Sequence, residues 1–260
     1  MKPVQKSFFG IDPGHEPDPV YYRHSPSSLN LFTASLATFV LERIHGIKQV
    51  VGVPAHRGTA IEEGVTAGLM RPDTPLKHCY DIAYTKYDEL TALSSDPRRE
   101  QYRATMPDMI DAAVTELRKY GVPTGTQGWV EWQPDGLRMP IVGRFDYEWA
   151  QHGIVADLKT TEKMPSKIKV PHARQVALYS RSDNAQSHLI YVTPKKIAPY
   201  KLENIGAHRQ ALANIARAVE AFLALSDDPD FFFTNTAPDV DSFYFKEPAQ
   251  RALAFKYWGV

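Results

Sequence analysis

Apolar and polar residues alternate through two neighbouring stretches, residues 137–149 and 154–160, in the two-residue period of β-strands. Residues 150–153 between them end in a glycine and fit a hairpin loop. Because strand side chains alternate faces, Asp157 and Lys159 point to one side of the second strand. The apolar set on the other side is assigned to the core and comprises Ile154, Ala156 and Leu158.

The pairing register of these strands decides how close two acidic residues come. If Trp149 pairs with Ile154, Asp146 and Asp157 become direct cross-strand neighbours, with Cβ atoms about 5 Å apart. A slip of one residue would put the two side chains on opposite faces. Carboxylates this close repel each other unless a cation or a proton lies between them. The hairpin, in this register, therefore predicts a pair of acids that needs a cation or a proton between them.

Helical periodicity dominates the rest of the chain. Ser25 is expected to cap a helix that starts at Pro26 and ends near Gly46. Further helices are predicted over residues 57–69, 74–93, 98–120, 171–182 and 205–225, with a break near Pro107. Further strands are predicted over residues 129–133, 188–193 and 200–203. This order predicts an α/β fold with a central mixed β-sheet flanked by α-helices and a helical N-terminal part.

The chain has 260 residues, of which 43% are hydrophobic, and suits one large α/β domain. Residues 1–120 are expected to be mainly helical, residues 121–204 to form the sheet core, and residues 205–260 to form a helix and an aromatic tail. Residues 1–24 are rich in proline and are expected to form an irregular arm. The tail is expected to pack onto the core, with base stacking as an alternative role. Its aromatic residues are Phe231, Phe232, Phe233, Phe243, Tyr244, Phe245, Tyr257 and Trp258.

Two carboxylates and a lysine on adjacent strands fit hydrolysis assisted by a hard metal ion. Mg²⁺ takes oxygen ligands, usually one or two carboxylates together with waters and substrate phosphate oxygens. The candidate ligands are Asp146, Asp157 and the backbone carbonyl of Leu158, and the Lys159 ammonium could orient the attacking water. An Asp-x-Lys triplet alone fits an exposed, salt-bridged strand face equally well. Its coincidence with Asp146 favours the metal site.

Five short segments together resemble motifs of the PD-(D/E)xK nuclease superfamily, in its RecB-like and phage-exonuclease branch. They read S-P-S-S-L (Ser25 to Leu29), R-G-T-A-I-E (Arg57 to Glu62), G-R-F-D (Gly143 to Asp146), D-L-K (Asp157 to Lys159) and Q-V-A-L-Y (Gln175 to Tyr179). The resemblance implies a restriction-endonuclease-like core and a Mg²⁺-dependent deoxyribonuclease, with Mn²⁺ able to substitute. It implies Glu62, Asp146 and Asp157 as metal ligands and Lys159 as the catalytic lysine. Gln175 and Tyr179 would organise the site and contact the substrate.

The resemblance also implies a biological role. It suggests an exonuclease that hydrolyses phosphodiester bonds in phage-type DNA recombination, repair or degradation. A structure-specific or nicking endonuclease on the same fold, and a nuclease module of a helicase complex, are the alternatives. DNA is then the main partner, with a single-strand annealing protein or a helicase as candidate protein partners.

Two features depart from the RecB-like pattern. Glu62 stands where those relatives usually carry histidine, and the adjacent Glu63 leaves open which of the two acids is the ligand. Several relatives hold an iron–sulfur cluster on four cysteines, which Cys79, the only cysteine, cannot supply. We expect the chain in the cytoplasm, because it has a lone cysteine, no signal-peptide-like start and no apolar run of about 18 residues. The resemblance implies a bacterial or phage-infected host.

Charge is balanced overall, with 30 Lys+Arg against 30 Asp+Glu, so the chain as a whole is not a basic DNA-binding body. Residues 159–174 are an exception, with five basic residues against one acid. Such a segment beside the site could follow a phosphate backbone, and an ordinary solvated loop is the alternative. The residues expected to contact substrate there are Lys163, Lys167, Lys169 and Arg174.

Overall fold

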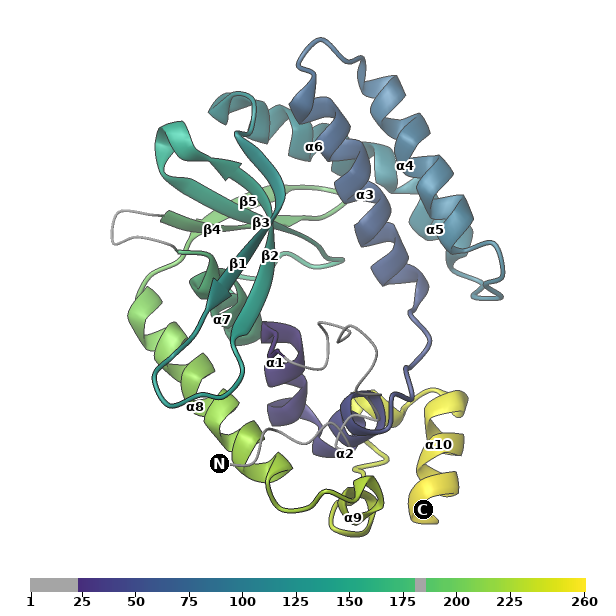
Figure 1. Ribbon diagram of the computed structural model, residues 1–260. Helices are drawn as coiled ribbons and strands as arrows, with labels where there is room; N and C mark the ends of the chain where they lie inside the picture. The colour runs from purple at the N-terminus through teal and green to yellow at the C-terminus, as the bar shows by residue number, and fades with distance from the viewer. Residues whose placement is uncertain (1–22, 181–185) are drawn as a thin grey trace, which may run out of the picture. The chain divides into compact units, whose positions relative to one another are not determined.

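The computed structural model describes residues 23–180 and 186–260 (Figure 1). The expected N-terminal arm and the last residues of the helix predicted up to 182 lie outside the described residues. The chain forms two compact units. One comprises Glu131–Gly143, Ala207–Val260 and the described residues up to Val50, and the other comprises Val51–Val130 and Arg144–Gly206. We call them the terminal unit and the sheet unit; the expected single domain with its three parts stays a prediction.

A mixed five-stranded sheet organises the sheet unit, in the order β1-β2-β3-β4-β5 (Figure 1). β2 pairs antiparallel with β3, β3 parallel with β4, and β4 antiparallel with β5. The parallel pair is joined through helix α7, as a parallel connection requires. This arrangement confirms the predicted α/β class and mixed sheet. The strands are β1 (Gly125–Trp132), β2 (Ile141–Trp149), β3 (Ile154–Thr160), β4 (Gln186–Val192) and β5 (Ile197–Lys201), and the helix is α7 (Val170–Tyr179).

The hairpin of β2 and β3 has the predicted register. Trp149 pairs with Ile154, and the ladder continues to Tyr147 opposite Ala156. A short 3₁₀ turn, Ala150–His152, connects the strands, and Gly153 closes it with a φ of 63°, which glycine adopts without strain. The apolar face of β3 lies in a buried cluster with helices α3, α4 and α6. The opposite face is thereby left to the charged side chains.

Helices α3 and α6 cover one face of the sheet and α7 the other (Figure 1). The helix predicted over residues 98–120 is interrupted as expected, because Pro107 begins a new helix after Thr105. The helix predicted to start at residue 57 begins four residues earlier, with Pro54 in its first turn. The helices of this unit are α3 (Val53–Met70), α4 (Leu76–Leu90), α5 (Arg99–Ala104) and α6 (Met106–Leu117), followed by a 3₁₀ turn at Arg118–Tyr120.

The terminal unit begins with the helix start predicted at Ser25. The Ser25 hydroxyl accepts from the backbone N–H of Ser28, and the Ser28 hydroxyl accepts from that of Ser25. The expectation of one helix up to Gly46 is wrong. Ser35 leaves the helical conformation and caps a second helix through Thr38, because its hydroxyl offers the backbone an alternative partner. The segments are α1 (Pro26–Ala34), α2 (Leu36–Phe39) and a π-helix (Val40–Ile44).

The chain after β5 forms helices α8 (Ile205–Leu223), α9 (Pro229–Thr234) and α10 (Pro248–Trp258), with a 3₁₀ turn at Phe243–Phe245 before α10. Much of the aromatic tail packs in a cluster with Ala37 and Leu41 of the same unit. Whether the tail also packs onto the core, as expected, stays a prediction. Its side chains find partners among themselves: Phe233 stacks on Tyr257 at 4.7 Å between ring centroids. No helix within residues 23–180 and 186–260 has the length and apolar character to cross a membrane.

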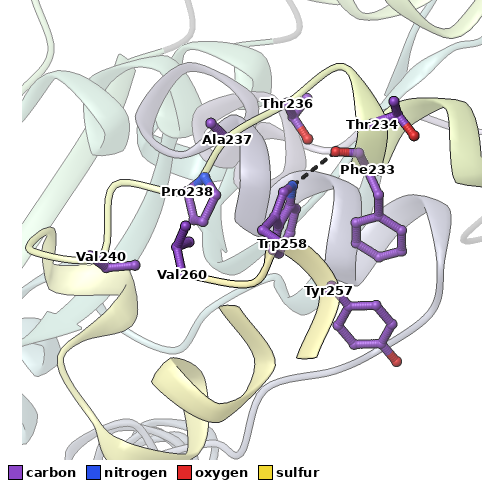
Figure 2. Close-up of a pocket in the computed structure, with 9 residues that line it drawn as sticks. All are labelled: Phe233, Thr234, Thr236, Ala237, Pro238, Val240, Tyr257, Trp258 and Val260. Carbon is purple, nitrogen blue, oxygen red and sulfur yellow. Dashed lines mark hydrogen bonds between the residues drawn. The ribbon is translucent and has the colours of Figure 1, made fainter. Parts of the chain in front are cut away.

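A pocket of about 600 Å³ opens in this tail (Figure 2). Its polar side chains are already bonded locally, since Trp258 Nε1 donates to the carbonyl of Phe233 at 3.0 Å and the two threonines donate to carbonyls within their own helix turn. Residues 226–241 carry five aspartates and no lysine or arginine, which disfavours a nucleic acid backbone here. The pocket is lined by Phe233, Thr234, Thr236, Ala237, Pro238, Val240, Tyr257, Trp258 and Val260.

Candidate active site

Two neighbouring strands bring the predicted acids Asp146 and Asp157 together. The β2–β3 ladder stops at Tyr147 and Ala156, one position before the two acids would pair directly. At that point the Asp146 carboxylate accepts the backbone N–H of Leu158 at 2.7 Å through Oδ2. Asp146 is 8% exposed and Asp157 is 0% exposed. The strands thus separate where the acids lie, and a side chain replaces a backbone acceptor there.

Lys159 lies beside Asp157, as the strand alternation predicted. Its Nζ is 2.5 Å from Asp157 Oδ2. Burial alone would lower the pKa of Lys159, but the carboxylates of Asp157 and Asp146 outweigh burial and raise it. The lysine is therefore a fixed positive charge next to the acids. An alternative in which Asp157 and Lys159 form an exposed strand face is excluded by the burial of Asp157.

Glu62 reaches the site from α3. Gly58, one turn earlier, allows the helix to approach the end of β3: a Cβ at this position would lie 3.0 Å from Thr160 Oγ1. The carbonyl of Glu62 accepts from the Tyr147 hydroxyl at 3.3 Å, which fixes this turn against β2. Glu63 instead faces α4, where it pairs with Lys86 at 3.6 Å. Of the two adjacent acids, Glu62 is therefore the one that faces Asp146 and Asp157.

Gln127 is a member of the site that the sequence did not reveal. Its side-chain Nε2 donates to Glu62 Oε1 and to Asp146 Oδ1, the latter at 3.3 Å. Its backbone has a φ of 52°, unusual for a residue with a side chain. Gly128 follows because a Cβ there would overlap the Phe145 ring. The strand was predicted to start at residue 129, and the glycines at 125 and 128 were the only signal that the backbone departs from regular strand geometry here.

The electrostatics of the site are dominated by excess negative charge. Burial, followed by the charges of Asp157 and Glu62, raises the pKa of Asp146 well above its usual value. Burial and the charge of Asp157 also raise the pKa of Glu62. Three acids thus share one ammonium group, and the charge of Asp157 makes ionisation of Asp146 and of Glu62 more costly. A cation bound between them would relieve this repulsion.

Helix α7 supports Asp157 through the predicted glutamine and tyrosine. Gln175 Nε2 donates to Asp157 Oδ1 at 3.0 Å and to the Tyr179 hydroxyl at 2.8 Å. The Tyr179 hydroxyl lies 2.8 Å from the carbonyl of Arg144 and 3.3 Å from Asp157 Oδ1. Tyr179 is 1% exposed, so its ring has no open face for a nucleotide. Of the two roles expected for it, the geometry fits the fixing of a carboxylate.

Arg57 is a second residue of the candidate site that was not expected there. In the sequence it was noted only as the first residue of the R-G-T-A-I-E motif. Its side chain is 2% exposed, and its guanidinium forms an ion pair with Glu162 just after β3. It also donates to Thr105 Oγ1 at 3.0 Å and lies over the Tyr102 ring at 4.7 Å. A buried arginine with these partners ties the start of α3 to the loop that leaves the site.

In the basic segment after β3, hydrogen bonds hold the main chain in place and the lysine side chains face solvent. The Tyr200 hydroxyl donates to the carbonyl of Pro165 at 2.7 Å, and the Lys169 N–H donates to the Tyr191 hydroxyl at 3.2 Å. Glu162, its one acid, is neutralised by Arg57 from another element. Lys163, Lys167 and Lys169 are exposed and Arg174 is half-buried.

The donor set fits a hard divalent cation. Asp157 Oδ2 is buried and accepts no well-aligned hydrogen bond, although Lys159 lies close to it. Asp146 Oδ1 faces only the neutral Gln127 amide, a donor that can move. Within residues 23–180 and 186–260, no three side chains of the metal-binding types are gathered in coordinating geometry. Mg²⁺ does not need such a cage, because waters and substrate phosphate oxygens complete its shell.

Comparison with known proteins and families shows what the chain is similar to. No curated protein matches the chain. One solved structure, "Crystal structure of SSO0001", is similar over 62% of this chain and 85% of its own, at 17% identity and a TM-score of 0.31. The sequence profile of the PD-(D/E)XK nuclease superfamily matches residues 23–237. The α/β fold with its mixed sheet agrees with that match, and the chain belongs to the PD-(D/E)XK nuclease superfamily.

Proposed function

We propose that this protein is a Mg²⁺-dependent deoxyribonuclease that removes nucleotides from DNA ends. Nucleases of its superfamily generally use divalent metal ions and act on DNA. The observation that carries the proposal is the convergence of three carboxylates, Glu62, Asp146 and Asp157, on a site with a single lysine, Lys159. Such an excess of buried negative charge suits a cation and a phosphodiester better than it suits a structural ion pair.

Asp146 and Asp157 would hold the metal, with Glu62 and the carbonyl of Leu158 as further ligands. When bound, Mg²⁺ polarises the phosphoryl group and makes water a stronger nucleophile. Mn²⁺ offers the same preference for oxygen ligands and would substitute. The Gln127 amide donates to the oxygens that the metal would take, so it competes with the cation for them. Its neutral hydrogen bonds are the weaker of the two interactions.

Lys159 supplies a permanent positive charge to the site, in addition to that of the proposed metal ion. Its raised pKa keeps it protonated at neutral pH. From beside Asp157 its N–H groups can hold a water in line with the phosphorus and offset the charge that develops on the phosphate oxygens. The flexible stem of lysine allows this with small movements.

Gln175 and Tyr179 act through Asp157. Gln175 donates a hydrogen bond to Oδ1, and the Tyr179 hydroxyl lies 3.3 Å from the same oxygen. These contacts orient the carboxylate and leave Oδ2 directed to Lys159 and the proposed cation. Supporting residues of this kind commonly alter metal affinity or activity about 10- to 100-fold when removed. We therefore assign Gln175 and Tyr179 a positioning role.

DNA would be positioned by the exposed lysines of the segment after β3. Lys163, Lys167 and Lys169 face solvent without an opposing acid in their own segment once Glu162 is paired with Arg57. Arg174 on α7 extends the same positive surface. Because the chain is neutral overall, we expect salt-sensitive, transient binding to DNA.

The preference for ends, and a role in phage-type recombination, repair or degradation, rest on the resemblance of the Arg57–Glu62 and Gln175–Tyr179 motifs to RecB-like and phage exonucleases. The same resemblance supports a bacterial or phage-infected host cytoplasm, with a single-strand annealing protein or a helicase as protein partner. These finer statements are part of the proposal.

The test compares two DNA substrates in the presence of Mg²⁺. End-labelled linear DNA and covalently closed circular DNA are incubated with the protein, with EDTA and the Asp157→Asn variant as controls. We expect loss of label from the linear DNA alone, and no cleavage in either control. Cleavage of the closed circle would replace the exonuclease proposal by an endonuclease. No cleavage of either substrate with Mg²⁺ or Mn²⁺ would overturn the nuclease assignment for this chain.

A further inference from the structure

We propose that Trp129 and Arg144 form a binding site for an unstacked nucleobase and its phosphate at a single-stranded DNA end. This inference rests on the proposed function and names the form of DNA that the site takes. Trp129 would stack on the base, and the guanidinium of Arg144 would bind the phosphate. Trp129 lies outside the five motifs, and Arg144 lies within G-R-F-D, two residues before Asp146. Neither residue was a candidate for metal or lysine chemistry.

Trp129 is an exposed aromatic residue on a strand of the active site. It is 56% exposed, whereas Val130 next to it is buried, so the indole stands on the open face of β1. It lies two positions after Gln127, whose amide contacts Glu62 and Asp146. A large aromatic side chain exposed beside a functional site is a common platform for ligands.

Arg144 places a positive charge over this platform. It is the exposed position of β2, two residues before Asp146, and its guanidinium carbon lies 5.8 Å from the centre of the Trp129 ring. Its Nε donates to the carbonyl of Gln127 at 3.0 Å, so this bond uses one of the three guanidinium nitrogens. Planar guanidinium groups bind phosphate through two nitrogens at once.

The pair is connected to both sides of the catalytic centre. The carbonyl of Arg144 accepts from the Tyr179 hydroxyl at 2.8 Å, and Tyr179 contacts Asp157. The charge of Arg144 also acts on Glu62, where it opposes the rise in pKa caused by burial. A nucleotide held by Trp129 and Arg144 would therefore lie next to the three carboxylates.

The chemistry of the pair selects single-stranded DNA. Bases inside a duplex are already stacked on their neighbours and present no free face to an indole. A base at a single-stranded or frayed end does, and base–aromatic stacking tolerates every base because all have a π-face. The described loop after β3 has no exposed aromatic residue of this kind beside its lysines. These lysines can therefore contact only the phosphate backbone of DNA, which duplex and single strand share. An end-specific contact thus needs Trp129.

The experiment measures DNA binding in the cleavage-deficient Asp157→Asn background with Mg²⁺. The probes are a fluorescein-labelled oligothymidylate and a blunt-ended hairpin duplex of the same label. We expect Trp129→Ala to weaken binding of the single strand roughly tenfold, with a much smaller effect on the duplex. Arg144→Ala is expected to reduce the log–log salt slope for the single strand by about 0.7.

Trp132→Ala is the matched control, since Trp132 is also a tryptophan of β1 but lies near Arg209 at 4.4 Å. Tryptophan emission gives a second readout: quenching by the oligothymidylate should largely disappear in Trp129→Phe and persist in Trp132→Phe. If Trp129→Ala does not fold, the comparison of quenching in Trp129→Phe and Trp132→Phe tests the inference. Unchanged binding and unchanged quenching, or equal losses on single strand and duplex, would overturn the inference. Cleavage by the wild-type chain is measured separately, so failure of the nuclease proposal is distinguishable from failure of this one.

Discussion

Two regions of this protein hold acidic side chains in opposite ways. In the terminal unit, the Glu220 carboxylate on α8 lies 3.2 Å from His24 Nε2 and accepts the backbone N–H groups of Arg138 and Met139 at 3.0 and 2.9 Å. The structure therefore provides the half-buried Glu220 with three donors. Such a carboxylate joins chain segments and has little capacity left for a ligand.

In the sheet unit, three acids share far fewer strong donors. Asp146 receives one backbone N–H and a neutral amide, and Lys159 is the one ammonium in contact with Asp157. Burial and mutual repulsion raise the pKa of Asp146 and of Glu62. The comparison separates an acid whose charge is satisfied by the fold from acids that are left with excess negative charge. That excess is what the proposed cation would balance.

Replacing Asp146 by asparagine should give the largest effect on activity. We expect cleavage to fall roughly 10³-fold or more, since a metal ligand worth several kcal/mol in the transition state is lost. In EDTA the free energy of unfolding should rise. The folded pKa of Asp146 lies above its unfolded value, so the charged form destabilises the fold at neutral pH, and this penalty disappears as the pH falls below the unfolded pKa. Denaturant unfolding at pH 7 measures the change, and a clear loss of stability would contradict the repulsion described here.

Replacing Glu220 by alanine should do the reverse. The backbone N–H groups of Arg138 and Met139 would lose a charged acceptor, and the free energy of unfolding should fall by about 3 kcal/mol. Activity per folded molecule should stay near normal. Glu220→Gln, which keeps an acceptor oxygen, should lose less stability. If Glu220→Ala abolished cleavage by protein that is still folded, Glu220 would not be a purely structural acid.

Gln175→Ala tests the support of Asp157. Turnover should fall about 10- to 100-fold because the Oδ1 contact is lost, while the melting temperature should change little. Gln210→Ala is a matched control: Gln210 on α8 also bonds to a residue four positions later, Asn214, at 2.9 Å. A fall in melting temperature with normal turnover for Gln175→Ala would make the residue structural only.

The smallest expected effect concerns the lysines after β3. Lys163, Lys167 and Lys169 are replaced together by alanine. The slope of the logarithm of the duplex-binding constant against the logarithm of the salt concentration should become shallower by about 2 to 3. Lys77→Ala with Lys119→Ala, on exposed lysines of other elements, should leave the slope unchanged. If the triple variant keeps the wild-type slope, the segment is a solvated loop, and Arg174 or Arg144 must carry the phosphate contacts.

Local patterns in the sequence predicted the parts of the site that depend on local geometry. The two-residue alternation placed Asp157 and Lys159 on one face, and the length of the hairpin loop gave the register of Trp149 with Ile154. The start of the first helix at Ser25 followed from capping chemistry alone. The α/β class with a mixed sheet followed from the order of elements, and the restriction-endonuclease-like core followed from the resemblance to the family.

Contacts between distant segments could not be predicted in this way. Gln127 joins Glu62 across 65 positions and Arg57 joins Glu162 across 105, and no periodicity within either segment signals such a partner. The aromatic tail was expected on the main core because its composition demands burial, but composition does not say against what. Ser35 divided a helix that the apolar stripe predicted as continuous, since a single hydroxyl outweighed the pattern.

The central claim, that Asp146, Asp157 and Glu62 hold a divalent cation, is tested most directly by calorimetric titration with Mn²⁺ and Mg²⁺. Wild-type protein should bind the metal with measurable heat, and Asp157→Asn should lose most of that binding while it remains folded by circular dichroism. This readout does not depend on DNA or on turnover. Equal metal binding by the wild type and by folded Asp157→Asn, or no binding by either, would contradict the account.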